Sequence, residues 1–131
     1  MNSEAGAHRD KARRLTSECC HLSPDSAPVA LISSCYYAIY HASVAALLAA
    51  NETTPTKHGK VHDALARLAK TREAPADAQK IKQAIEDAYE MRIRADYDPD
   101  ARPEETRRNA ERIPALRDTV IAFCDRVIDG T

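Results

Sequence analysis

Apolar residues recur along this chain at intervals of three and four, which is the period of an amphipathic α-helix. The pattern predicts helices over about residues 4–21, 26–50, a shorter stretch after Thr56, 76–96 and 104–128. Segments that contain proline separate them. The period-two alternation typical of strands is missing. The sequence therefore predicts an all-α fold, an antiparallel up-and-down bundle of four to five helices.

The segment 26–50 differs from the others because it is apolar nearly all round. One stripe passes through Leu31 and Cys35, and a second runs through Ile32 and Ile39. A helix that is apolar on most sides is usually buried. We therefore expect this helix to be central, with its many Ala and Ser residues allowing close approach of its neighbours.

Length and charge narrow the class of protein. The 131 residues predict a single domain over 1–131. Hydrophobic residues make up 44% and charged residues 30%, which excludes a disordered chain. Lys and Arg number 19 against 20 Asp and Glu, so the net charge is -1. A generally basic nucleic-acid coat is ruled out, whereas a local basic patch is not.

Targeting signals and cysteines point to the same setting. No apolar run approaches the roughly 20 residues that a membrane helix needs, and the N-terminal residues contain no apolar signal core. We therefore expect a cytoplasmic protein that does not contact a membrane. The four cysteines, at positions 19, 20, 35 and 124, form no Cys-x-x-Cys pair. We expect reduced thiols, no metal site and no cofactor.

The first segment that could carry chemistry lies in the predicted central helix. Three of the five tyrosines, Tyr36, Tyr37 and Tyr40, fall within five positions, and His41 follows them. Tyrosine buries a large ring while its hydroxyl needs a partner. Core packing is the simpler interpretation for Tyr36, Tyr40 and His41; the alternative is that Tyr37, Tyr40 and His41 line a pocket.

The second segment reads Lys-His-Gly-Lys-Val-His over residues 57–62. His58 and His62 are four residues apart and would share one face of a helix. A zinc-protease site would need a Glu directly after the first histidine, and two lysines would repel a cation. Anion binding by Lys57, Lys60 and the free N–H groups of a helix start is favoured over metal binding. The alternative is a helix cap with a solvated face.

The third segment covers residues 89–98. Arg92 and Asp96 form an i, i+4 pair on one helical face that continues to Tyr89. An acidic residue at a helix C-terminus opposes the helix dipole, so Asp96 is expected to have a specific partner. Two interpretations stay open, a structural ion pair and an arginine-lined cleft that binds phosphate.

Together these segments resemble a known family. Residues 34–42, Ser-Cys-Tyr-Tyr-Ala-Ile-Tyr-His-Ala, resemble the Tyr-Tyr-Ala-x-[Tyr/Phe]-[His/Tyr]-Ala signature of HEPN-domain proteins. Residues 57–62 resemble their Thr-His-x-Gly-Val-type segment. Residues 92–97, Arg-Ile-Arg-Ala-Asp-Tyr, are similar to the Arg-x-x-Ala-Asp-Tyr motif of the small stand-alone branch. The motifs occur in the family's order and span about residues 30–100.

The resemblance implies a helical bundle that pairs into a homodimer. Many such proteins are metal-independent ribonucleases, often toxins encoded beside a nucleotidyltransferase antitoxin, and others bind nucleotides or assist a partner nucleotidyltransferase without catalysis. It implies a phosphate- or RNA-binding site whose candidate residues are Arg92, Arg94, Asp96, Tyr97, Lys57 and His58.

One departure leaves catalysis open. The ribonuclease members carry an Arg followed, about four to six residues later, by a His that moves a proton near neutral pH. The last histidine here is His62, and Tyr97 and Asp98 occupy the corresponding places. Three hypotheses follow. The first, favoured one is RNA or nucleotide binding in a toxin–antitoxin or defence pair, with the arginines near position 93 and the tyrosine-rich helix lining one pocket. The others are a non-catalytic interaction module and a ribonuclease with a rearranged acid–base pair.

Overall fold

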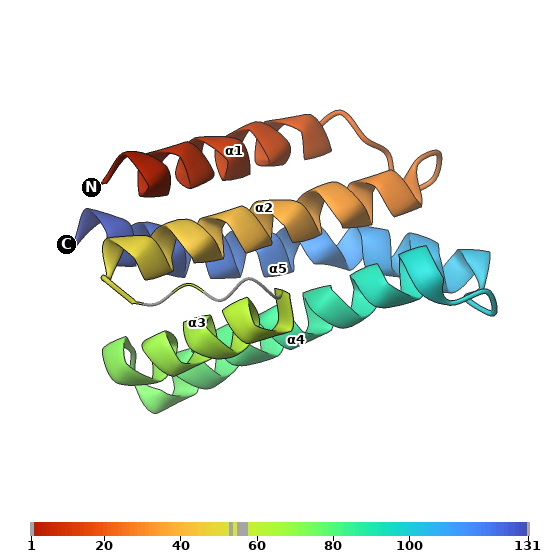
Figure 1. The fold of residues 1–131 in the computed structure, drawn as a ribbon. Helices are drawn as coiled ribbons and strands as arrows, with labels where there is room; N and C mark the ends of the chain where they lie inside the picture. The colour runs from red at the N-terminus through yellow and green to blue at the C-terminus, as the bar shows by residue number, and fades with distance from the viewer. Residues whose placement is uncertain (1, 53, 55–57, 131) are drawn as a thin grey trace.

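Five helices make up the fold (Figure 1). The computed structural model describes residues 2–52, 54 and 58–130. The helices are α1 (Ser3–Cys19), α2 (Pro28–Ala49), α3 (His58–Arg72), α4 (Pro75–Tyr97) and α5 (Pro103–Asp129). No strand occurs in the described residues. The predicted all-α fold and its five helices are confirmed, although α1 ends at Cys19 rather than near residue 21.

Proline marks where three of the helices begin. Pro28, Pro75 and Pro103 are the first residues of α2, α4 and α5. At this position the missing N–H costs nothing, because the first N–H groups of a helix have no partner within it. Helix α1 begins differently: the Asn2 side chain accepts a hydrogen bond from the Ala5 amide at 2.7 Å. The loops therefore end where the sequence pattern predicts.

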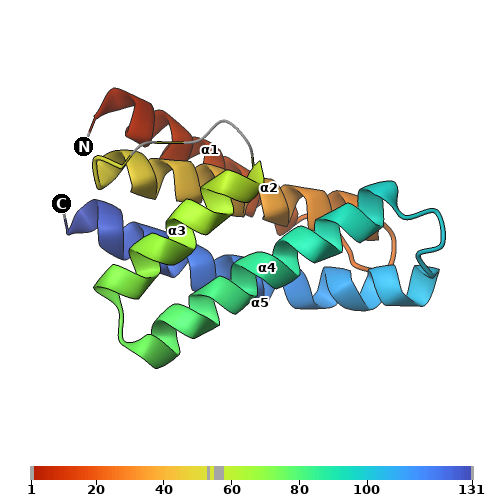
Figure 2. The same ribbon diagram turned by 60° about the horizontal axis from the view of Figure 1, so that its bottom comes forward.

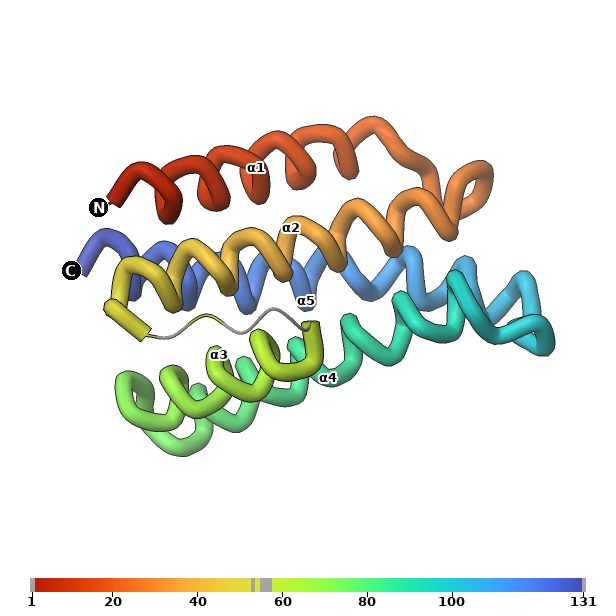
Figure 3. Tube along the Cα trace, in the orientation of Figure 1, coloured from red at the N-terminus to blue at the C-terminus, as the bar shows by residue number. Residues whose placement is uncertain are grey.

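Four long helices form the bundle, and the shorter α3 lies on one side of it (Figures 1 and 3). Helix α1 runs antiparallel to α2, and α4 runs antiparallel to α5, while α2 and α5 lie side by side and point the same way. Helix α3 packs on α4 and α2 and points in the same direction as α2 (Figure 2). The two termini lie at the same end of the molecule.

Helix α2 is the centre of the bundle, as predicted. It packs against all four other helices, and twelve of its 22 residues are buried. Small side chains such as Ala38, Ala45 and Ala46 are fully buried and let the neighbouring backbones approach. This burial places the tyrosine-rich part of α2 next to α3 and α4.

By length and composition alone, α2 also passes for a membrane-spanning helix. Its 22 residues contain an 18-residue window of mean hydropathy 1.4. The expectation that no segment approaches membrane-spanning length is therefore wrong for α2. That window is 67% buried inside the bundle, and a core helix of this kind passes the same test of length and hydropathy.

Candidate functional site

The hydroxyl of Tyr36 joins α2 to α3. Tyr36 is fully buried, and its hydroxyl oxygen lies 2.8 Å from His58 Nδ1 and 3.1 Å from His62 Nε2. The two histidines reach one atom because they are four residues apart, on the same face of α3. A hydroxyl carries one proton, so it donates to one ring nitrogen and accepts from the other. The two histidines that were predicted to share a helical face thus both contact the Tyr36 hydroxyl.

Burial sets the protonation of this group. It raises the pKa of Tyr36 well above its usual value, so the phenol stays protonated. Burial also lowers the pKa of His62 to about 4, and it lowers the pKa of His58, to which the charge of Arg92 adds. At neutral pH both imidazoles are therefore neutral, and each can accept or donate one proton.

Arg92 of α4 lies over three tyrosine rings. Its Cζ is 5.3 Å from the Tyr36 centroid, 5.4 Å from that of Tyr37 and 5.3 Å from that of Tyr97. Its Nη2 donates to the hydroxyls of Tyr37 at 2.9 Å and Tyr97 at 3.4 Å. Its Nε lies 3.1 Å from Asp96 Oδ2 without making a hydrogen bond. The predicted Arg92–Asp96 pair is confirmed.

Stacked rings connect Arg92 to the histidines. His58 stacks on Tyr40 with centroids 4.0 Å apart and meets the edge of Tyr37 at 5.8 Å. Tyr89 packs against His62 at 5.0 Å. We call this group the aromatic cluster, and its members are Tyr36, Tyr37, Tyr40, His58, His62, Tyr89 and Arg92. Three helices contribute to it, so it exists only in the folded chain.

A surface groove borders the aromatic cluster between α3 and α4. Its volume is about 620 Å³. His58, His62 and Tyr89 line it as well as belonging to the cluster. The other lining residues are Gly59, Lys60, Asp63, Ile85 and Glu86. The cluster is therefore open to a ligand on its histidine side.

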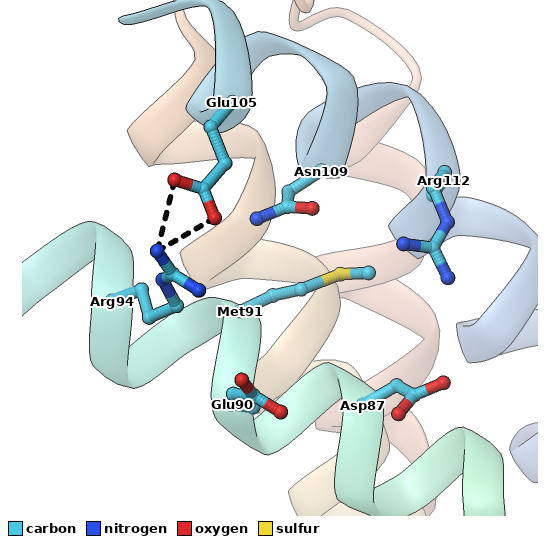
Figure 4. A pocket seen from close by; sticks show the side chains of 7 residues that line it. All are labelled: Asp87, Glu90, Met91, Arg94, Glu105, Asn109 and Arg112. Atoms are coloured by element: carbon cyan, nitrogen blue, oxygen red, sulfur yellow. Dashed lines mark hydrogen bonds and ion pairs between the residues drawn. The ribbon is translucent and has the colours of Figure 1, made fainter. Parts of the chain in front are cut away.

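Arg94 does not join this group, although it is only two residues from Arg92. Its Nη2 lies 2.7 Å from Glu105 Oε1 of α5 (Figure 4). It lines a separate pocket of about 200 Å³ between α4 and α5. The other residues of that pocket are Asp87, Glu90, Met91, Glu105, Asn109 and Arg112. The expectation that both arginines line one pocket is corrected: α4 turns Arg94 toward α5, where three carboxylates outnumber two guanidinium groups.

His41 also lies apart from the phosphate candidates. Its Nδ1 is 2.9 Å from Nδ1 of His8 in α1, and the two rings stack at 5.2 Å. Burial lowers the pKa of His41 to about 4, helped by the charges of His8 and Lys11. It reaches the aromatic cluster only through the edge of Tyr40, at 5.3 Å. His41 is thus half-buried and in contact with His8, away from Arg92.

The site residues predicted from the sequence thus fall into two groups, those in or beside the aromatic cluster and those outside it. Tyr37, Tyr40, His58 and Arg92 meet in the cluster, with Asp96 and Tyr97 on Arg92, whereas Lys57 lies outside the described residues. The site candidates did not include Tyr36, His62 and Tyr89. Their signals were present in the i, i+4 spacing of the histidines and in the position of Tyr89 one turn before Arg92.

No group of three or more His, Cys, Asp or Glu side chains placed to hold a metal occurs in the part of the chain that the structure describes.

Comparison with known proteins identifies the family. No curated protein matches the chain. The sequence model of the HEPN domain matches residues 7–127, which is nearly the whole length. With five helices and the three motifs in place, the chain belongs to the HEPN domain family.

Proposed function

We propose that this HEPN domain binds single-stranded RNA at the aromatic cluster, with Arg92 on a phosphate and Tyr97 against a base. Membership of the family suggests an RNA-binding or ribonuclease-like function. Proteins that bind single strands combine cationic groups for the backbone with aromatic rings on which bases stack. Both elements meet around Arg92.

The observation that carries this proposal is how Arg92 is held. Three tyrosine rings and two tyrosine hydroxyls contact the guanidinium, and Asp96 is its one carboxylate neighbour among the described residues. Among the described residues no hydrogen bond is made by Nη1, and this nitrogen is not among the buried unsatisfied atoms. The N–H groups of Nη1 are therefore left to donate to a phosphate oxygen, a charge-assisted hydrogen bond.

Tyr97 provides the second element. It is 65% exposed, which is unusual for a large aromatic side chain, and its hydroxyl accepts a hydrogen bond from Arg92. Stacking of a base on such a ring contributes about 1–3 kcal/mol and tolerates any base. A phosphate on Arg92 would place the neighbouring nucleotide beside this ring.

The test is RNA binding measured over a salt series. A fluorescent single-stranded oligonucleotide is titrated with wild type, Arg92→Ala, Tyr97→Ala and Arg94→Ala, and anisotropy gives Kd. We expect Arg92→Ala to weaken binding about tenfold or more, or about 1.4 kcal/mol. It should also reduce the slope of log K against log salt by about one, which corresponds to the loss of one phosphate contact. Tyr97→Ala should weaken binding with little change in that slope, because it removes no charge.

Arg108→Ala is the matched control, since Arg108 is an exposed arginine of α5 without contacts to the cluster. We expect its binding and slope to follow wild type, and Arg94→Ala to behave similarly. Equal losses for Arg92→Ala and Arg108→Ala would indicate diffuse charge attraction instead of a site. All variants are assayed below their own melting temperatures.

A ribonuclease is the second candidate, and the position of His58 favours it. His58 Nδ1 is bound to Tyr36, while its Nε2 has no hydrogen-bond partner among the described residues. The ring touches Tyr37, to which Arg92 donates. A neutral imidazole near a phosphate-binding arginine could take the proton of a ribose 2′-hydroxyl as that oxygen attacks the adjacent phosphate. The bond from phosphorus to the 5′-oxygen of the next nucleotide then breaks, and that oxygen leaves with a proton from water. This would be an Arg–His pair drawn from two helices instead of one motif.

Cleavage of labelled RNA tests this second candidate. We expect products that end in a cyclic phosphate, loss of cleavage in Arg92→Ala and His58→Gln, and no effect of a metal chelator. The rate should fall as the pH drops below the lowered pKa of His58, because the base must be neutral. Binding without cleavage by wild type would leave the RNA-binding proposal and eliminate the ribonuclease.

Assembly and cellular role also belong to the proposal. The homodimer, the partner nucleotidyltransferase, the toxin–antitoxin or defence pairing and the cytoplasmic location are all supported by the family resemblance alone. Analytical ultracentrifugation of the full chain tests the dimer, and growth arrest on expression, lost in Arg92→Ala, tests toxicity. A non-catalytic interaction module would bind its partner protein equally well with Arg92 or Ala at this position.

A further inference from the structure

Two cysteines on neighbouring helices lie in direct contact, away from the aromatic cluster. Cys19 is the last residue of α1, and Cys35 lies in α2. Their Sγ atoms are 3.4 Å apart, and the Cys35 thiol donates to Cys19. The residues are only 4% and 0% exposed, and both thiols are free. They are sixteen positions apart in the chain, so the fold brings them together.

A buried arginine completes the group. Arg117 of α5 is buried, and its Nη1 lies 3.5 Å from Cys35 Sγ. Asp118 holds the guanidinium through Nη2 at 2.9 Å. A positive charge beside a thiol favours the thiolate, which is the reactive form of cysteine. Three helices thus converge on one pair of sulfur atoms.

The acidity of the two thiols differs accordingly. The hydrogen bond from Cys35 and the guanidinium of Arg117 lower the pKa of Cys19, whereas donation to Cys19 and burial raise the pKa of Cys35. Burial raises the pKa of Cys124 well above the normal range, although a hydrogen bond with Ser43 and the charge of Arg126 act against it. Cys19 also lies at the end of α1 and is the more accessible of the two, so it is the nucleophile of the pair and Cys35 is the second thiol.

We propose that Cys19 and Cys35 are a redox-active pair that a peroxide converts into a reversible disulfide between α1 and α2. The contact of the two sulfurs, their burial and the adjacent guanidinium carry this inference. The oxidant is assigned as a peroxide because a small molecule reaches a nearly buried sulfur at a helix end most easily, where the last turn opens most readily.

The reaction has two steps. The Cys19 thiolate attacks one oxygen of hydrogen peroxide; the O–O bond breaks, hydroxide leaves, and Cys19 becomes a sulfenic acid. The Cys35 sulfur then attacks the Cys19 sulfur, the S–O bond breaks, and the departing hydroxide takes the Cys35 proton as water. In total, two thiols lose two hydrogen atoms, and the peroxide is reduced to two molecules of water.

The product would link the helices where the aromatic cluster is built. A disulfide needs its sulfurs about 2.05 Å apart, so the pair closes by a side-chain rotation and a small shift of the α1 end. Cys35 directly precedes Tyr36, the residue that holds both histidines. Oxidation therefore fixes this part of α2 against α1.

The experiment uses the reduced full chain treated with hydrogen peroxide, quenched by alkylation and weighed intact. We expect loss of the mass of two hydrogen atoms, restored by a dithiol, and a higher Tm after oxidation. Asp25 lies between the two cysteines, so cleavage before Asp25 separates their peptides unless a disulfide joins them. Added oxygen without a cross-link, a bridge to Cys124 or a cross-link between two chains would overturn the proposal.

Variants assign the steps. Cys20→Ser should form the same disulfide, because Cys20 is exposed and only its neighbour touches Cys35. Loss of the bridge in Cys20→Ser would place the reaction at Cys20 and overturn the assignment. Cys35→Ala should stop at a sulfenic acid on Cys19 that dimedone traps. Arg117→Lys should slow oxidation several-fold and shift the pH dependence of the rate to higher pH. An unchanged rate would contradict the role of the guanidinium in activating the pair.

Discussion

Two arginines of α4 have opposite environments although only one residue separates them. The Arg92 side chain is 13% exposed and lies over three tyrosine rings, with Asp96 as its one carboxylate neighbour. The Arg94 side chain is 41% exposed and pairs with Glu105 in a pocket that holds two further carboxylates. A helix of 3.6 residues per turn points side chains two positions apart in nearly opposite directions. Residues that are close together in a sequence motif can therefore lie on different faces of a helix.

The comparison also separates two ways to hold a cation. Aromatic faces attract a guanidinium without neutralising it, so its charge stays available to a ligand. Carboxylates neutralise it, and an anionic ligand must then displace them. Because the face of α4 toward α2 and α3 sets a single carboxylate, Asp96, against three rings, we infer that it is better suited to an anion than the face toward α5, which ties two helices together.

The largest expected effect comes from acid, and it should fall on the Arg92 side. His62 has a pKa of about 4 in the folded chain, below the value of about 6.5 expected when unfolded. The unfolded chain therefore binds the proton more strongly. Stability is full above about pH 6.5 and is lost as the pH falls toward 4, by about 3 kcal/mol from this residue.

Urea unfolding at pH 7 and near pH 4.5 measures this loss. Tyr36, Tyr89, His58 and Asp63 surround the imidazole. His62→Gln should remove this residue's share of the pH dependence and leave that of His41, whose pKa is also lowered to about 4. His21→Gln is the control, because His21 is exposed and follows α1, outside the aromatic cluster. An equally steep loss in His62→Gln would mean that His62 is not the group that titrates.

The next largest effect should distinguish the two arginines directly. Arg92→Ala removes charged hydrogen bonds and ring contacts from a mostly buried site, so we expect a loss of about 2 kcal/mol in the free energy of unfolding. Arg94→Ala should cost less than about 1 kcal/mol, as for exposed ion pairs. Denaturation by urea measures both. Equal losses would show that the two environments do not differ energetically.

Removing one hydroxyl should have a smaller effect. Tyr36→Phe keeps the ring but leaves a nitrogen of His58 and one of His62 without a partner, which should cost about 1–2 kcal/mol. Tyr97→Phe is the matched control, because its hydroxyl is exposed and should change stability by less than about 0.5 kcal/mol. If both variants unfolded at the same urea concentration, Tyr36 would not be the hub of the cluster.

The fold could be read from the sequence because local signals agree with it. Pro28, Pro75 and Pro103 mark helix starts, and three- and four-residue spacing gives the buried faces. The Arg92–Asp96 pair and the shared face of His58 and His62 follow from the same helical period. These are contacts within a helix or a property of one face, and one sequence is enough to specify them.

Contacts between helices could not be predicted in this way. Nothing local indicates that Arg94 turns to Glu105, that His41 pairs with His8, or that Cys19 meets Cys35. Each depends on the rotation of one helix about its axis relative to another, which packing of many side chains decides. The expectation that no segment approaches membrane-spanning length failed for a related reason. The apolar composition of α2 reflects its central place, and composition alone does not separate a core helix from a membrane helix.

The smallest effect concerns the Arg94 side alone. A double-mutant cycle with Arg94→Ala and Glu105→Ala isolates their interaction, which we expect at about 0.2–1 kcal/mol because Arg94 is 41% exposed. High salt should reduce it further, since exposed charges are screened. The same cycle on Arg92 and Asp96 should retain most of its coupling in salt, because those side chains are 13% and 25% exposed. If salt weakened both cycles equally, the two faces of α4 would hold their cations in the same way, and the argument for an anion site at Arg92 would lose its electrostatic basis.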